Sequence, residues 1–326
     1  MTDLTGKQIL ITGINGFIGS HLARTLIKEG ATVHGTSRHP HETPYLDSFE
    51  IKNKLQLHTL DVRKAQDVES LLRAHSFDGI FHLASQADAW KSSNEPHSTF
   101  DVNVQGTANL LEAIRKSNQS PSIVLASSVR VFHREEEKLN EEHLSLHPYD
   151  ASKLEAEVTA TSYFNTYGMN GAIARNTNTY GENDLNFNRL LPRLMKGIFH
   201  DGKVTLWGNG TVKRDFMHVS DTVTGMRALY TALSHTHMRG KSFTFASGKL
   251  HTIREIVTIL SQCSTKLFQV EWDEHNTLQD RNQAALDIQE TTRALNWSPR
   301  VELTQGLDQT LKWYRAYFTQ QGRNDA

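Results

Sequence analysis

The chain has 326 residues, of which 37% are hydrophobic and 22% are charged, and its formal net charge is −1. This length favours one large domain with a smaller appended lobe, and the near-neutral charge excludes a general basic field that would attract nucleic acid or anionic lipid. The sequence has a single cysteine, no run approaching the about 20 apolar residues of a membrane helix and no signal-peptide pattern at its start, so we expect a cytoplasmic protein without membrane or nucleic-acid partners.

The first half of the chain alternates between strand and helix patterns. Short apolar runs predict buried parallel strands, and amphipathic spacing between them predicts helices. Repeated βα units imply an α/β fold with a doubly wound parallel sheet and right-handed crossovers. We expect strands at 7–12, 31–37, 55–60, 78–84, 122–128 and 171–176, and helices at 16–30, 65–75, 99–117 and 149–168.

The pattern loosens after Tyr180, where polar loops mix with short helices. We therefore expect one domain over residues 1–180 and a smaller C-terminal lobe over residues 181–326, parts of which thread back to the sheet. The single cysteine, Cys263, lies in a helical pattern and is expected to be a buried structural thiol.

A glycine-rich turn, "TGINGFIG" at positions 12–19, separates the first expected strand from the first helix. Gly13 allows a tight turn, Gly16 lets the backbone approach a pyrophosphate, and Gly19 lets the helix pack on the strand. The helix N-terminus then presents free N–H groups and a positive dipole end to the phosphates. This strand–turn–helix context predicts a dinucleotide site.

The end of the second strand bears on the choice between NAD and NADP. An acid there would bind the ribose 2′-hydroxyl of NAD, but the sequence gives Thr36, Ser37 and Arg38, with no acid until Glu42. Hydroxyls and a guanidinium suit a 2′-phosphate, so we favour NADP. Alternatively, Arg38 stacks on the adenine and either cofactor fits. Asp61, after the third strand, either accepts from the adenine amino group or caps the following helix.

A serine, a tyrosine and a lysine form the candidate catalytic group. Tyr149 and Lys153 are four residues apart in a predicted helix, so their side chains share one face. A phenol with a pKa of about 10 is a poor base at neutral pH, but a neighbouring ammonium and a cationic nicotinamide would lower that pKa. Tyr149 would then exchange a proton with a sugar hydroxyl during hydride transfer. Lys153 would also hold the nicotinamide ribose, and Ser128 would hydrogen-bond the same sugar oxygen.

Together these motifs resemble the extended short-chain dehydrogenase/reductase family of nucleotide-sugar epimerases and dehydratases. The resemblance runs from about Gly6 to Tyr314 and implies a Rossmann-type sheet with a C-terminal substrate lobe. It also implies NAD or NADP as cofactor, a nucleotide-diphosphate sugar as substrate, and a homodimer formed through helices 99–117 and 149–168, with Leu110 and Ala156 as candidate contacts. The supporting segments are "TGINGFIG", "HLASQA", "NVQGTANLLEA", the Tyr149/Lys153 pair, "RNTNTYG", "RDFMHVSD" and "NWSPRVELTQGLDQTLKWY".

Within the family, "DLNFNRLLPRLM" beside "HPYDASK" is most similar to CDP-glucose 4,6-dehydratases. Arg214 matches the family's diphosphate contact, and Asn178 lies in the segment that borders the substrate; Asp215 is expected to be structural. Asn188, Arg189 and Arg281 are further candidate substrate contacts, with a surface ion pair as the alternative for the two arginines. The expected cofactor contacts are Gly13, Asn15, Gly16, Phe17, Ile18, Gly19, Ser37, Arg38, Asp61, Val62, Leu83, Ala84, Ser85, Tyr149 and Lys153.

Two positions depart from the dehydratase pattern. The resemblance implies an acid directly after the catalytic serine and then a Glu or Lys, which remove the C6 hydroxyl and the C5 proton. This chain has Val129, which cannot donate a proton, and Arg130, which stays protonated and is a poor base. We therefore expect hydride transfer at C4 that ends in epimerisation or in reduction of a 4-keto sugar.

Other outcomes stay open at this point. Dehydration would need a substitute acid, from Asp88 or from the run "HREEEK" at 133–138. A non-catalytic NADP-binding sensor or scaffold is the alternative of another class, but such a protein is expected to lose the tyrosine or the lysine. The histidine pairs 39/41 and 235/237 have no nearby cysteine or acid partners, so we expect no metal site. His82 is expected to be a hydrogen-bonded histidine at a strand end.

Overall fold

The computed structural model describes residues 4–132, 147–275, 283 and 285–324, which form two compact units. The first unit comprises Met1–Asn176, Val223–Phe245 and Glu290–Trp297. The second comprises Thr177–Thr222, Ala246–Gln289 and Ser298–Ala326. The chain therefore returns to the first unit twice. Our division at residue 180 into a cofactor domain and a substrate lobe concerns function and stays a prediction.

A seven-stranded sheet forms the centre of the first unit, and each pair of neighbouring strands in it is parallel. The strand order is β10-β6-β5-β4-β1-β2-β3, which is the doubly wound order of dinucleotide-binding sheets with β10 added beside β6. The α/β Rossmann-type fold expected from the sequence is thereby confirmed. The strands are β1 (Gln8–Thr12), β2 (Thr32–Ser37), β3 (Gln56–Thr59), β4 (Gly79–His82), β5 (Ser122–Ser128), β6 (Gly171–Asn176) and β10 (Ser242–Phe245).

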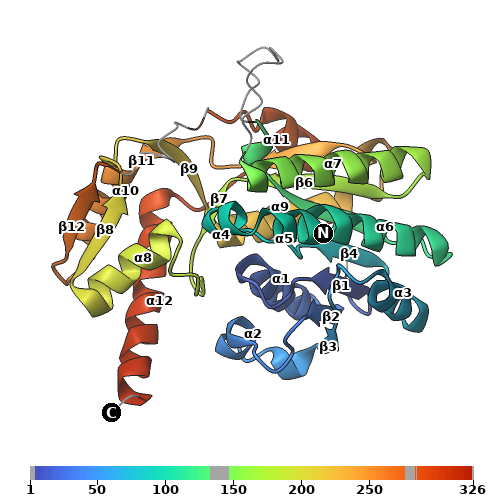
Figure 1. Ribbon diagram of the computed structural model, residues 1–326, viewed down its shortest axis with the longest axis horizontal. Coiled ribbons are helices and arrows are strands. Elements are labelled where there is room, and N and C mark those ends of the chain that lie inside the picture. Colours follow the sequence, from blue (N-terminus) through green and yellow to red (C-terminus); the bar gives the residue numbers. More distant parts are fainter. Residues whose placement is uncertain (1–3, 133–146, 276–282, 284, 325–326) are drawn as a thin grey trace. The chain divides into compact units, whose positions relative to one another are not determined.

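Helices cover the sheet and supply its core (Figure 1). Leu71 of α3 and Leu111 of α6 belong to one apolar cluster with Leu10 and Ile80 of the sheet, and all four are buried. The helices of this unit are α1 (Phe17–Lys28), α2 (Pro44–Ser48), α3 (Ala65–Ala74), α4 (Ala89–Asn94), α5 (Pro96–Phe100), α6 (Gly106–Lys116) and α7 (Pro148–Thr166). The short 3₁₀ segments are η1 (Lys52–Lys54), η3 (Val129–Phe132) and η6 (Thr236–Met238).

The helix expected over 99–117 is not one regular helix. α5 is followed by a π-helical turn, η2 (Asp101–Gln105), and only then by α6. π-turns are rare and frequently mark functional positions, and periodicity alone does not predict them. Two further helices join the units in sequence, α9 (Val219–Ala232) and α11 (Gln289–Leu295).

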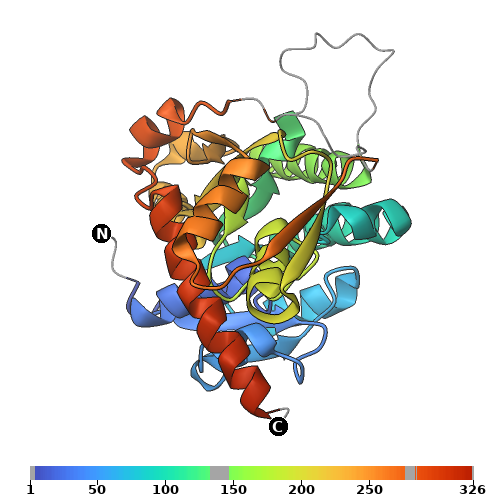
Figure 2. The ribbon, with the colours of Figure 1, turned by 90° about the vertical axis from the view of Figure 1, so that its left-hand side faces the viewer.

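The second unit contains two small sheets, one with the order β11-β9-β7 and one that pairs β12 with β8. Its core gathers buried residues such as Leu194, Leu260 and Tyr314, and α12, red in Figure 2, packs with α10 in this cluster. Among the described residues no helix, α12 included, combines the length and apolar character needed to cross a bilayer. The elements are β7 (Asn178–Tyr180), α8 (Leu190–Lys196), η5 (Gly197–Asp201), β8 (Lys203–Trp207), β9 (Lys213–His218), β11 (Leu250–Thr252), α10 (Ile253–Cys263), β12 (Gln269–Asp273) and α12 (Leu303–Asn324).

Two expectations about burial were wrong. Cys263, the last residue of α10, is only partly buried, because it packs at the margin of the second unit's core. Leu110 of α6 and Ala156 of α7 are 2% and 4% exposed, since both face the inside of the protomer. They are therefore not available as contacts between two copies.

Candidate cofactor and catalytic site

The glycine turn follows β1 at the point where the strand order reverses between β1 and β4, which is where doubly wound sheets bind ligands. Gly13 has a φ of 70°, and a Cβ there would lie 2.8 Å from the backbone of Ala84. A Cβ at Gly19 would lie 2.5 Å from the carbonyl oxygen of Gly13, whereas one at Gly16 would meet only that oxygen, at 3.3 Å. Gly13 and Gly19 thus permit close packing of the backbone, whereas Gly16 has little around it and leaves space for a ligand.

The N-terminus of α1 is suited to bind an anion. Gly16 is its N-cap, no described side chain caps the helix, and its first turn contains no acidic residue. Asn15 donates from Nδ2 to the carbonyl of Glu42 at 2.5 Å, while its buried Oδ1 has no hydrogen-bond partner among the described residues. Phe17 is buried and Ile18 half-buried. Uncapped amides and an orphaned amide oxygen fit a dinucleotide at this turn.

The predicted adenosine contacts lie at the ends of β2 and β3. Arg38 is exposed, and Ser37 accepts a hydrogen bond from the backbone N–H of His39 at 3.1 Å. Asp61 accepts from the Arg63 guanidinium at 3.0 Å and 2.5 Å, and these hydrogen bonds lower the pKa of Asp61. Asp61 does not cap α3, because the N-cap of that helix is Lys64. The next predicted contact, Val62, is buried.

The loop after β4 carries the predicted contacts Leu83, Ala84 and Ser85 and is fixed by Asn103 of the π-turn. Asn103 Oδ1 accepts from Ser85 Oγ at 3.0 Å and from the Gln86 N–H at 2.7 Å. Asn103 Nδ2 donates to the Gln86 carbonyl at 3.1 Å and to Ser152 Oγ at 2.9 Å. Asn103 thus joins the loop after β4 to α7. Sequence reasoning missed this role, although the residue lies in the "NVQGT" segment.

Ser128, Tyr149 and Lys153 all belong to the first unit, and each is less than 10% exposed. Ser128 ends β5, and Tyr149 and Lys153 lie in the first turns of α7, which packs against that strand. Lys153 Nζ donates to the Ala126 carbonyl at 3.0 Å, and burial lowers the pKa of Lys153 to about 8. The structure therefore places a buried, hydrogen-bonded ammonium one helical turn from a tyrosine.

The two residues after Ser128 are held in structural roles. Val129 is buried. Arg130 forms a bidentate ion pair with Asp150, with Nε–Oδ1 and Nη2–Oδ2 distances of 2.5 Å and 3.2 Å, and its guanidinium lies 5.7 Å from the centre of the Tyr149 ring. The guanidinium of Arg130 is thus directed at a buried carboxylate. Of the substitute acids that we considered for dehydration, Asp88 caps α4 by accepting from the Lys91 N–H, and the run 133–138 lies outside the described residues.

His82 is hydrogen-bonded on both ring nitrogens, as expected. Its Nδ1 lies 2.7 Å from Thr12 Oγ1 and its Nε2 lies 3.1 Å from Thr107 Oγ1. Burial, and then the nearby Lys153 charge, lower the pKa of His82 to about 3, so its ring is neutral at pH 7. It connects β1, β4 and α6 from inside the unit.

The predicted substrate residues belong to the second unit. Asn178 Nδ2 donates to the Asp215 carbonyl at 2.8 Å and to Gln283 Oε1 at 3.1 Å. Arg189 forms an ion pair with the buried Asp184 at 3.1 Å, Asn188 is exposed, and Arg281 lies outside the described residues. Gln283 was not predicted, because an isolated glutamine in a loop gives no sequence signal.

Arg214 lies on β9, which pairs with β7 and β11. The next residue, Asp215, is buried and accepts from the N–H and hydroxyl of Ser247, both at 2.9 Å. Its expected structural role is confirmed. It fixes the strand from which Arg214 projects.

Comparisons with known proteins agree with this geometry. Residues 9–239 match the model of the NAD dependent epimerase/dehydratase family. A UDP-glucuronate 4-epimerase from Thermodesulfobacterium geofontis is 27% identical, over 93% of this chain and 95% of that protein. A CDP-glucose 4,6-dehydratase from Salmonella typhimurium is 25% identical, over 96% of this chain and 91% of that protein.

Among solved structures, the UDP-glucuronic acid 4-epimerase from Bacillus cereus, in complex with UDP-glucuronic acid and NAD, has a TM-score of 0.82 and 25% identity. The match covers 95% of this chain and 99% of that chain. The preference for NADP that we inferred from Ser37 and Arg38 finds no support in these comparisons, since the family is described as NAD dependent.

Proposed function

Because the chain belongs to the NAD-dependent epimerase/dehydratase family, we propose that it is an enzyme that inverts C4 of a nucleotide-diphosphate hexose. The observation that carries this proposal is the combination of a Ser128/Tyr149/Lys153 group with Val129 and Arg130 in the two following positions. This combination retains the groups needed for hydride transfer at C4 and lacks those needed for elimination.

The proposed chemistry assigns one proton to Tyr149. A nicotinamide bound at the glycine turn would supply reversible hydride transfer, in which the hydride leaves C4 and returns to the opposite face of the 4-keto sugar. The Tyr149 phenolate takes the proton from the C4 hydroxyl, and the phenol formed in this way later returns it to the C4 oxygen. Ser128 hydrogen-bonds the same oxygen. Lys153, held at the Ala126 carbonyl, supplies a positive charge that favours the phenolate.

Two side chains support epimerisation over dehydration. Loss of the C6 hydroxyl needs a proton donor, and Val129 offers none. Removal of the C5 proton needs a base, and the Arg130 guanidinium is both permanently protonated and paired with Asp150. We therefore propose that the 4-keto sugar is reduced again rather than dehydrated.

For the substrate, we propose a nucleotide diphosphate bound by Arg214, with Asn178 and Asn188 as further polar contacts. Relatives named for UDP- and CDP-sugars support this substrate class. Arg189 is a weaker candidate than its sequence position indicated, because the buried Asp184 already engages its guanidinium. We keep Arg281 as a predicted contact.

For the cofactor, we propose NAD or NADP at the glycine turn, contacted by the residues that the sequence analysis named. The exposed Arg38 side chain distinguishes the two cofactors. Its guanidinium would pair with the 2′-phosphate of NADP, whereas with NAD it would only stack on the adenine. We also propose a cytoplasmic homodimer that pairs through α6 and α7. Val158, in the middle of α7, and Tyr167, its C-cap, are 63% and 53% exposed and replace Leu110 and Ala156 as contacts.

The decisive experiment incubates the purified enzyme with UDP-, CDP-, GDP- and dTDP-hexoses and follows mass and configuration by mass spectrometry and proton NMR. We expect an isobaric product with one nucleotide sugar. Loss of one water would reject the proposal, and a gain of two hydrogens by a 4-keto sugar with NADPH would assign the reductase reaction instead.

A matched variant tests the proton role. Tyr149→Phe should abolish turnover while the cofactor still binds, because only the hydroxyl is removed. Full turnover by the variant would exclude Tyr149 as the base. Loss of cofactor binding with an intact fold would make it a binding residue instead.

A further inference from the structure

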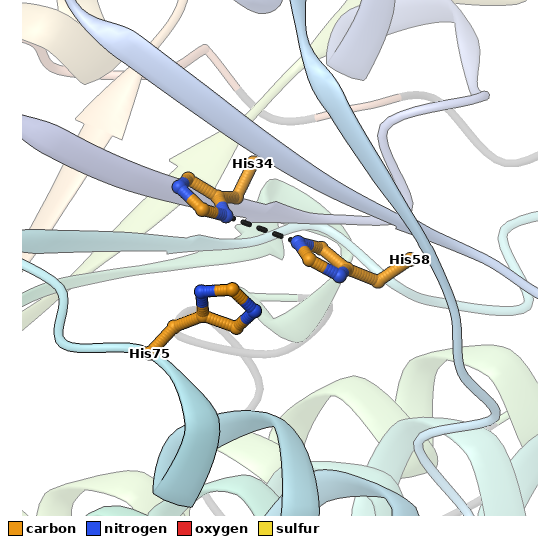
Figure 3. Close-up of side chains that lie close together, drawn as sticks. All are labelled: His34, His58 and His75. Carbon is orange, nitrogen blue, oxygen red and sulfur yellow. Dashed lines mark hydrogen bonds between the residues drawn. The ribbon is translucent and has the colours of Figure 1, made fainter.

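Three histidines that are distant in sequence meet at the edge of the main sheet (Figure 3). His34 lies in β2, His58 in the edge strand β3, and His75 directly after α3. One ligand nitrogen from each ring can be chosen so that all three lie within 4.8 Å of one another. The cluster is part of the first unit and does not include the candidate catalytic residues.

Strand register explains why the rings meet. Leu10 of β1 pairs with His34, and Thr36 of β2 pairs with His58. Since side chains alternate along a strand, Gln8, His34 and His58 project from the same face of three adjacent strands. α3 packs on this face, and its C-cap brings His75 beside the other two rings.

The hydrogen bonds fix the proton positions. His34 Nε2 lies 3.0 Å from Gln8 Oε1, an oxygen that can only accept, so His34 carries its proton on Nε2. His34 Nδ1 is then a lone pair that accepts from His58 Nε2 at 3.0 Å (Figure 3), so metal binding at these two nitrogens moves the His58 proton from Nε2 to Nδ1. A histidine that binds a metal typically donates its other N–H to an oxygen in this way, which orients the ring. Gln8 thus holds His34 in the tautomer that a metal requires.

We propose that His34, His58 and His75 bind one divalent transition-metal ion of the zinc class through their imidazole nitrogens. Zn–N bonds of about 2.0–2.1 Å in a tetrahedron require nitrogens about 3.3 Å apart. The 3.0 Å His34–His58 pair is already close to this spacing, and the third nitrogen needs a shift of at most about 1.5 Å from the 4.8 Å limit. Three neutral imidazoles favour Zn²⁺, Ni²⁺ or Cu²⁺ over Mg²⁺ or Ca²⁺, which prefer oxygen ligands.

The three histidines differ in exposure, and the two more exposed ones leave a route by which an ion can enter. His34 is 3% exposed, whereas His58 and His75 are half-buried at the sheet edge. Burial and the two neighbouring imidazoles lower the pKa of His34 to about 4, so this ring is neutral at pH 7, as a ligand must be. The half-exposed rings can turn, and water can supply the fourth ligand.

The sequence analysis did not find this cluster, because it weighed only histidines close in sequence. Of the pairs it considered, His39 and His41 are exposed, and His235 and His237 stack with ring centres 5.7 Å apart. The second pair lacks a third histidine, cysteine or carboxylate in range among the described residues. It therefore serves as a natural control.

The test uses the whole 326-residue chain, treated with EDTA to remove bound metal and titrated calorimetrically with Zn²⁺ and, separately, Mg²⁺. We expect one Zn²⁺ per chain and no heat from Mg²⁺. His58→Gln and His75→Gln should each weaken Zn²⁺ binding by more than about tenfold, since ligand loss exceeds the effect of losing an outer partner. Both positions are half-buried, so far-UV circular dichroism and cofactor binding should match the unaltered protein without metal.

Two further variants sharpen the result. The double variant His235→Gln/His237→Gln should bind Zn²⁺ like the unaltered protein. Gln8→Ala should weaken binding by about tenfold, and Gln8→Glu should restore it, because a carboxylate also accepts from His34 Nε2. Absence of saturable Zn²⁺ binding, unchanged affinity in both single variants, or loss confined to the 235/237 variant would each overturn the proposal.

Discussion

Replacement of Arg130 by methionine tests the claim that this residue stabilises the catalytic helix instead of acting on the substrate. Asp150 lies in the first turn of α7, beside Tyr149, and is 2% exposed. Its carboxylate is paired with Arg130 through two hydrogen bonds. Arg130→Met removes the cation and keeps much of the aliphatic stem, so the carboxylate stays buried without its partner.

The expected cost follows from the burial of the two partners. Removing one member of a fully buried ion pair destabilises a protein by about 3–5 kcal/mol. The Arg130 side chain is 36% exposed, so water screens part of the interaction. We therefore expect Arg130→Met to lower the free energy of unfolding by about 2 kcal/mol, between the values for buried and surface pairs.

Urea denaturation followed by far-UV circular dichroism measures this loss. Asp150→Asn in the Arg130→Met background should restore more than half of it, because a neutral amide is less costly to bury than an unpaired carboxylate. Arg115 of α6 provides the control: it makes an equally bidentate pair with Glu112, with both N–O distances 2.7 Å, but at the surface. Arg115→Met should leave the midpoint almost unchanged. An unchanged midpoint for Arg130→Met, or no recovery in the double variant, would refute this reasoning.

Three further predictions concern the cofactor turn and the buried histidines. Arg38→Ala should weaken NADP binding by about tenfold and NAD binding much less if the guanidinium binds a 2′-phosphate, and calorimetry showing equal losses would indicate adenine stacking instead. Gly19→Ala should reduce cofactor affinity and destabilise the fold by about 1–3 kcal/mol, because its Cβ would lie 2.5 Å from the Gly13 carbonyl oxygen; an unaltered melting temperature and affinity would contradict this. The pKa values of His34 and His82 in the folded protein are lowered to about 4 and about 3. Between these values and pH 6.5, the two histidines bind protons in the unfolded chain and not in the native one. The free energy of unfolding therefore falls as the pH falls. Each histidine should cost about 1 kcal/mol between pH 7.5 and 5.5, and His82→Gln should remove about half of this dependence; a flat urea midpoint over that range would contradict the pKa shifts.

Local patterns in the sequence predicted most of the first unit. The apolar runs that became β1, β4, β5 and β6 were recognisable because a parallel strand covered by helices on both faces has no polar alternation. The glycine turn was recognisable because glycine adopts the φ of 70° at Gly13 without strain and has no Cβ to meet the backbone at Gly19. These features depend on residues within one strand–turn–helix segment.

Pairings between distant segments were not predictable. Asn103 contacts the loop after β4, 17 residues away, and Ser152, 49 residues away. Gln283 contacts Asn178 across 105 residues. An amide side chain has the same local signature whether it is solvated or fixed by four hydrogen bonds, so sequence spacing carries no information about it. The same holds for the three histidines of the proposed metal site.

A buried network of polar side chains that starts at Thr12 fixes the first turn of α7, the helix that carries the proposed catalytic residues. Thr107 Oγ1 donates to the Asn103 carbonyl at 2.6 Å, so it accepts from His82 Nε2, and His82 Nδ1 therefore accepts from Thr12 Oγ1. Asn103 donates to Ser152 Oγ, which donates to the Tyr149 carbonyl at 2.8 Å.

In this hydrogen-bond network each hydroxyl donates its proton to the next acceptor. No side chain of the network can rotate without leaving a buried polar group unpaired, which costs about 1–3 kcal/mol. Strand β1, which begins the cofactor turn, and the backbone of the tyrosine that we assign as base are thus held by one continuous set of hydrogen bonds. This explains why a neutral, fully buried histidine is compatible with the site. His82 links β1 and β4 to α6, and its protonation would turn Nδ1 from an acceptor into a second donor, which opposes the Thr12 hydroxyl that donates to it.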